Sequence, residues 1–195
     1  MGPGIIIPLV IIAIVVPLAF KWAKNTFKDA PTADDTAAVA SGARLTSNAL
    51  RDLPTPEWRV VYEIADERLG GVEHVLIGPP GVFAIQSSMD PLPADRGGES
   101  RGDPQEVARV AIVRGDLDDA LAPCVMTSDR LVQVHWGATV GEPQAAVELF
   151  PGLTAVDGRR VSEWTAGLAP SLSPSQVDLA WQTVTTAIGR PDPLA

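Results

Sequence analysis

Two apolar segments around a proline-glycine turn constrain the fold of this chain more than any other feature. Residues 72–77 and 82–85 are rich in Val, Ile, Leu and Phe, and they flank Gly78-Pro79-Pro80-Gly81. Proline presets φ and glycine permits unusual backbone angles, so this tetrapeptide favours a tight reversal between two strands. Residues 72–87 are therefore predicted to form a β-hairpin whose apolar side chains fill a core.

The hairpin resembles the central hairpin of the nuclease-related domain (NERD) family. In that family the first strand carries Ile-Asp-His, the turn reads Gly-Pro-x-Gly-Val-Phe, and the second strand ends in Glu-x-Lys. The corresponding residues here are Glu73-His74 and Gln86-Ser87-Ser88. An upstream helix of the family carries Gly-Glu, where this chain has Gly42-Ala43, and weaker matches extend the resemblance from about Ala40 onward.

The resemblance implies one mixed-sheet α/β domain with a restriction-endonuclease-like core. Nucleases of this broader type hold a divalent metal with two or three carboxylates and stabilise charge with a lysine. Ala43, Gln86 and Ser88 replace two of the carboxylates and the lysine, and only Glu73 keeps an acidic group. A neutral amide or hydroxyl cannot replace a carboxylate on Mg²⁺ without a large loss of affinity. We therefore expect a pseudoenzyme without catalytic residues, metal or cofactor.

A rebuilt active site is the alternative. A metal-dependent nuclease or nucleic-acid-binding protein could use Glu63, Glu73 and a migrated residue such as Asp90. Other chemistries have less support, because His74 and His135 lack a second His or Cys at ligand spacing and no phosphate-binding glycine motif is present.

The first segment of the chain predicts a membrane anchor. Residues 4–20 contain no charged or strongly polar side chain, and with Lys21 and Trp22 they approach the ~20 residues that span a bilayer as a helix. We predict a transmembrane anchor at residues 1–23, a juxtamembrane linker at 24–35 and a NERD-like domain at 36–195. A cleaved signal peptide would need a preceding basic region, which is absent. A buried core helix is the remaining alternative.

Basic residues after the apolar segment predict its orientation. Lys21, Lys24 and Lys28 all follow the predicted span. Because positive charge accumulates on the cytoplasmic side, the N-terminus is expected outside the cell membrane and the domain in the cytoplasm, as in a single-pass membrane protein. The single Cys124 fits this compartment, since it permits no intramolecular disulfide.

The charge of the domain argues against nucleic acid as a partner. All 24 acidic residues lie at or after Asp29, where 12 of the 15 basic residues remain, so this region carries a net charge of −12. Binding to a phosphate backbone normally depends on Lys and Arg that neutralise phosphates. Arg159-Arg160 is the one basic pair in this region that we considered as a phosphate contact, and we interpret it as a solvated helix start.

Local patterns predict the remaining elements. We expect a helix from about residue 36 to 53, a strand at 57–65, a surface loop at 89–103 and a helix from Pro104 to about Leu121. Two strands are expected at 123–128 and 131–136, followed by one short strand and two helices. Ser173-Pro174-Ser175-Gln176 is a capping box with proline at the first helical position. Val177, Trp181, Val184 and Ile188 share one face of the helix that follows.

These observations favour a membrane-anchored, catalytically inactive domain that acts through protein contacts. The partner is expected to be an integral membrane protein, with this chain as an accessory subunit of its complex. An active metal-dependent nuclease is the competing hypothesis.

Overall fold

The computed structural model describes residues 33–62, 64, 69, 71–93, 104–138 and 144–188. The chain divides into two compact units, Met1–Ala37 and Ala38–Ala195. The sheet and the helices that pack on it belong to the second unit, apart from the first turn of one helix.

A six-stranded mixed sheet forms the centre of this second unit. The strands follow the order β1-β2-β3-β4-β6-β5. The first three form an antiparallel meander, β3, β4 and β6 run parallel, and β5 pairs antiparallel with β6. The strands are β1 (Arg59–Val61), β2 (His74–Gly78), β3 (Gly81–Ser88), β4 (Arg130–His135), β5 (Ala146–Phe150) and β6 (Leu153–Asp157).

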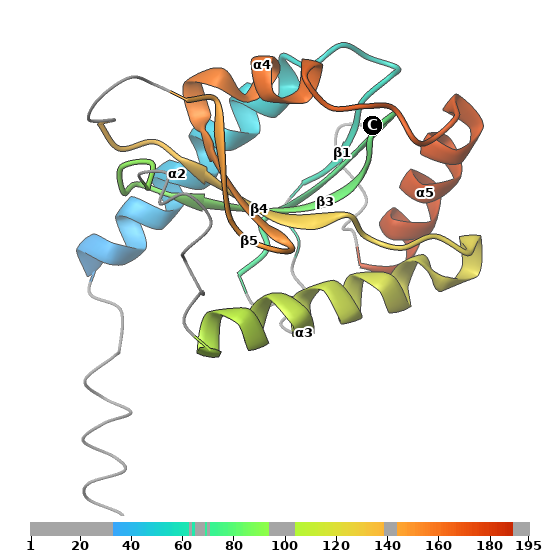
Figure 1. Ribbon diagram of the computed structural model, residues 1–195, viewed down its shortest axis with the longest axis horizontal. Helices are drawn as coiled ribbons and strands as arrows, with labels where there is room; N and C mark the ends of the chain where they lie inside the picture. Colours follow the sequence, from blue (N-terminus) through green and yellow to red (C-terminus); the bar gives the residue numbers. More distant parts are fainter. Residues whose placement is uncertain are drawn as a thin grey trace, which may run out of the picture. The chain divides into compact units, whose positions relative to one another are not determined.

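Helices cover both faces of the sheet (Figure 1). One apolar cluster joins α3 and α5 to the face formed by Val82, Ala84 and Leu131. The second cluster joins α2 and α4 to the opposite face, which carries Phe83 and Ile85. The helices are α2 (Ala33–Arg51), α3 (Pro104–Leu121), η3 (Ala122–Cys124), η4 (Gly158–Arg160), α4 (Val161–Ala166) and α5 (Pro174–Ala187).

The predicted hairpin is confirmed as β2 and β3. The register runs from His74 opposite Ile85 to Gly78 opposite Gly81. Gly78 is required by packing, because a Cβ at this position would lie 2.2 Å from Cε3 of the buried Trp58 ring. The hairpin is therefore held by a side chain that precedes β1 as well as by its own turn.

The predicted fold class needs a correction. The mixed α/β domain is present, but in the described ranges no helix is long and apolar enough to cross a membrane, so the transmembrane helix is not part of the architecture found. The two longest helices, α2 and α3, each carry several charged side chains along their length. The segment predicted as an anchor, with Lys21, Lys24 and Lys28, lies outside the described residues.

The region after α3 also differs from expectation. Residues 123–128 form no strand, because Pro123 lies in η3 and Val125 has a left-handed φ of 56°. Proline cannot donate to a strand ladder, and a left-handed residue cannot extend one. The second strand of the expected pair is present as β4, which pairs parallel with β3.

Candidate functional site

A chain of hydrogen bonds joins the hairpin, α2 and the segment after β4. Trp136 Nε1 donates to Thr46 Oγ1 over 2.9 Å, Thr46 Oγ1 lies 2.8 Å from Ser87 Oγ, and the Ser87 hydroxyl donates to Glu73 Oε2. An indole N–H only donates and a carboxylate only accepts, so every donor in this chain is directed towards Glu73. We call Trp136, Thr46, Ser87 and Glu73 the Glu73 chain. Its centre is dry, since Thr46 is fully buried.

His74 lies beside the Glu73 chain and has a packing role. Its Nε2 is 3.1 Å from Ser47 Oγ and 3.4 Å from the carbonyl oxygen of Ala43. The Tyr62 ring meets the imidazole edge-on, with the ring centroids 5.5 Å apart. This confirms the expectation that His74 packs and hydrogen-bonds near the hairpin.

The four residues predicted as equivalents of the family's catalytic set do not share one pocket. Side chains alternate along a strand, so Ser87 faces α2 with Phe83 and Ile85, whereas Gln86 and Ser88 face the side of α3. The Gln86 carbonyl accepts from Arg109 Nη1 over 2.7 Å, and the Ser88 hydroxyl donates to Asp90 Oδ2 over 3.0 Å.

The structure thus places Ala43 on the α2 side, where the Glu73 carboxylate also makes its contact with Ser87. Gln86 and Ser88 are separated from these two residues by the sheet. The family alignment passed over Ser87 because that position is variable in Glu-x-Lys. The period of two in the apolar residues of β3 is the signal that could have assigned Ser87 to the α2 face.

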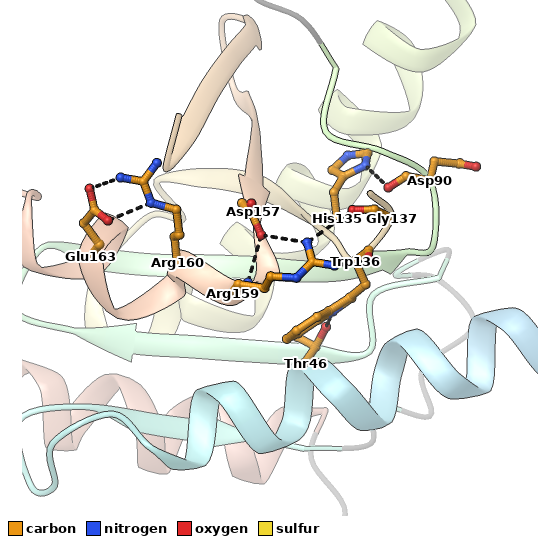
Figure 2. A network of polar contacts seen from close by, with 9 residues as sticks. All are labelled: Thr46, Asp90, His135, Trp136, Gly137, Asp157, Arg159, Arg160 and Glu163. Carbon is orange, nitrogen blue, oxygen red and sulfur yellow. Dashed lines mark hydrogen bonds and ion pairs between the residues drawn. The ribbon is translucent and has the colours of Figure 1, made fainter. Parts of the chain in front are cut away.

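The segment 135–137 after β4 is held from several sides, as Figure 2 shows. Arg159 donates from Nη2 to the carbonyl of Trp136 and from Nη1 to that of Gly137, over 3.2 and 3.3 Å. The buried carboxylate of Asp157 accepts from the backbone N–H of Arg159 over 2.9 Å. These contacts fix the indole that begins the Glu73 chain.

The basic pair Arg159-Arg160 has the structural role expected of it. Arg159 pairs with Asp157 and Arg160 with Glu163, whose Oε2 lies 2.7 Å from Arg160 Nε (Figure 2). The two arginines end η4, directly before α4. They are therefore engaged at a helix start, which confirms that interpretation.

Burial shifts the ionisation of two groups near these contacts. Desolvation raises the pKa of Glu73 above that of an ordinary glutamate, and the hydrogen bonds from Ser87 partly oppose the shift. Desolvation lowers the pKa of His135, against an opposing hydrogen bond to the Asp90 carbonyl. The carboxylate at the end of the Glu73 chain is thus destabilised when charged.

Replacing Glu73 with glutamine is expected to flatten the pH dependence of stability. Because the pKa of Glu73 is raised in the folded protein, its contribution is most favourable below the unfolded-state pKa and is lost as pH rises through the folded-state pKa. Thermal unfolding between about pH 4 and 7 should show a shallower decline for Glu73→Gln, with the exposed Glu57→Gln as the control. A variant that is less stable than the parent at pH 7 and equal to it at pH 4 would reverse the predicted sign.

The residues do not fit the metal that the family resemblance implies. Ala43, Gln86 and Ser88 offer no carboxylate, and within the described ranges no group of three or more His, Cys, Asp or Glu side chains is placed to hold a metal ion. Asp90 contacts Ser88, and Glu63 of the rebuilt-site alternative lies outside the described residues.

Comparison with family models, with curated proteins and with solved structures found no match for this chain. The resemblance to the NERD family and to a restriction-endonuclease-like core therefore rests on the hairpin residues and stays a prediction.

Proposed function

We propose that Ala38–Ala195 is a catalytically inactive, NERD-like domain that acts through protein contacts. One observation carries the proposal: Glu73, the one acidic group at the family-equivalent positions, is bound by Ser87 at the end of a hydrogen-bond chain. A carboxylate used in this way holds the hairpin to α2.

The surroundings of the other equivalent positions support the same conclusion. Arg109 brings a guanidinium to Gln86, where an active relative would need a metal-binding carboxylate. Mg²⁺ requires several oxygen ligands in near-octahedral geometry, and two or more of them are normally carboxylates or substrate phosphates. The amide of Gln86 is instead used to join β3 to α3.

Charge supports a protein partner over a nucleic acid. The net charge of −12 beyond Lys28 repels a phosphate backbone, and Arg159 and Arg160 are engaged by Asp157 and Glu163. A protein with a complementary basic surface would instead be attracted by this domain.

A nuclease assay tests this function. The full chain, incubated with single- and double-stranded DNA and RNA in Mg²⁺ and separately in Mn²⁺, is expected to cut no faster than its Glu73→Gln variant. Gel analysis of the products is the readout, and Ser88→Ala, on the other side of the sheet, serves as the matched control. Metal-dependent cutting that Glu73→Gln abolishes and Ser88→Ala retains would overturn the proposal in favour of a rebuilt nuclease.

A further inference from the structure

The outer face of α3 is apolar although it lies on the surface. Val107 is 42% exposed and Ile112 is 62% exposed. The buried face of the same helix carries Val110, Val113 and Leu117. A surface helix normally presents polar side chains to solvent, and a helix that is apolar on both sides is usually covered on both. The sequence therefore equips α3 for a second packing partner.

Small residues form the centre of this outer face. Ala108, Ala111 and Gly115 follow one another at spacings of three and four residues, and all three are exposed. A Cβ built on Gly115 would meet no atom within 4 Å. Residues spaced in this way lie along one line of a helix, and their small size allows another helix to approach closely. Ile112 flanks the line and would supply the buried apolar area.

The charges along α3 indicate what that partner helix is. Asp116 and Asp119 lie in the last turns of the helix, whose final turn has no basic residue. Acidic groups there are unfavourable, because the C-terminal end of a helix carries partial negative charge. The same two groups would be favourable beside the N-terminal end of an antiparallel helix. A second copy of α3 provides that end.

A side-by-side alignment of two antiparallel copies makes the match specific. With the two-fold axis near Ala111, each Ile112 lies close to Ile112 of the second copy. Asp116 then lies on the flank that carries Arg109 of the other helix, and Asp119 lies beside the other helix's first turn at Pro104. The Arg109 side chain is 36% exposed, so its charge remains accessible from this side.

We propose that two copies of this chain associate through the outer faces of α3, packed antiparallel about Ala111. This dimer does not rest on the proposed function, and the nuclease assay above is independent of it. Its isologous geometry is the usual one for a homodimer, in which the same patch is used twice.

Cysteine crosslinking of the full chain tests the arrangement. In a Cys124→Ser background, Ala111→Cys is expected to form a disulfide-linked dimer under mild oxidation, because residues at the axis meet their own copy. Differently tagged Ala108→Cys and Gly115→Cys chains should crosslink to each other more readily than either does to itself. Preferred self-crosslinking of both would indicate a parallel pair and would overturn the proposal.

Sedimentation of the full chain in mild detergent gives a second readout. Ile112→Glu is expected to raise the dimer dissociation constant by about a hundredfold, because both copies lose a buried apolar contact. Leu179→Glu on α5, which replaces another exposed large apolar residue, is the matched control and should leave the constant unchanged. Equal dissociation constants for Ile112→Glu and the parent, or a monomer at about 100 μM together with no Ala111→Cys crosslink, would exclude this dimer.

Discussion

Replacing Gly78 with alanine is expected to destabilise the protein by about 3 kcal/mol or more. The new Cβ would lie 2.2 Å from Cε3 and 2.5 Å from Cζ3 of Trp58, which is far inside van der Waals contact. The ring cannot simply yield, because Trp58 is buried in the cluster that contains Leu53 and Leu76. Either the hairpin or the indole must move out of the core. Urea unfolding followed by tryptophan fluorescence measures the loss.

The same substitution at Gly115 is the control, because nothing lies within 4 Å of that site. Alanine is favoured over glycine inside a helix by about 1 kcal/mol, so Gly115→Ala should stabilise the chain. The double variant Trp58→Ala/Gly78→Ala should cost less than the sum of its single variants, since removing the ring removes the clash. Strict additivity would show that Trp58 does not cover Gly78.

Replacing Thr46 with valine is expected to cost about 1–3 kcal/mol, although the side-chain shape is almost unchanged. Thr46 is fully buried, and its hydroxyl meets both Trp136 Nε1 and Ser87 Oγ. Valine would leave these two groups without that partner in a region that excludes water. The loss should appear as a lower urea midpoint with an unchanged slope.

Thr186→Val is the matched control for this prediction. Thr186 is exposed on α5, and its hydroxyl bonds only to the Gln182 carbonyl one turn earlier. The change there should stay within about 0.5 kcal/mol. Equal effects at the two positions would mean that the Glu73 chain adds nothing beyond an ordinary threonine.

Local patterns predicted well wherever neighbouring residues decide the outcome. The turn at Gly78-Pro79-Pro80-Gly81 and the capping box at Ser173 and Gln176 are both present, since each depends on backbone angles and contacts within a few residues. The predicted core stripe of α5 is also confirmed, with Val177 and Val184 buried. Such signals need no knowledge of the rest of the chain.

Patterns that depend on distant segments were less informative. The apolar content of residues 123–128 is compatible with a strand, but Pro123 and the left-handed Val125 place this segment in a turn beside α5. In α3, Val107 and Ala111 fit the helical spacing of a core face, yet the structure buries Val110 and Val113 and exposes Val107. With apolar residues on both sides of a helix, only the packed sheet determines which side turns inwards.

The candidate site shows the same division. The sequence alone determined that Ala43, Gln86 and Ser88 cannot supply the carboxylates and lysine of the resembled family, because ligand chemistry follows from residue type. The tertiary structure decided that Gln86 joins α3 while Ser87 connects Glu73 to Thr46 and Trp136. Those contacts join four elements distant in sequence, and the strand register that aligns them depends on both faces of the sheet being covered.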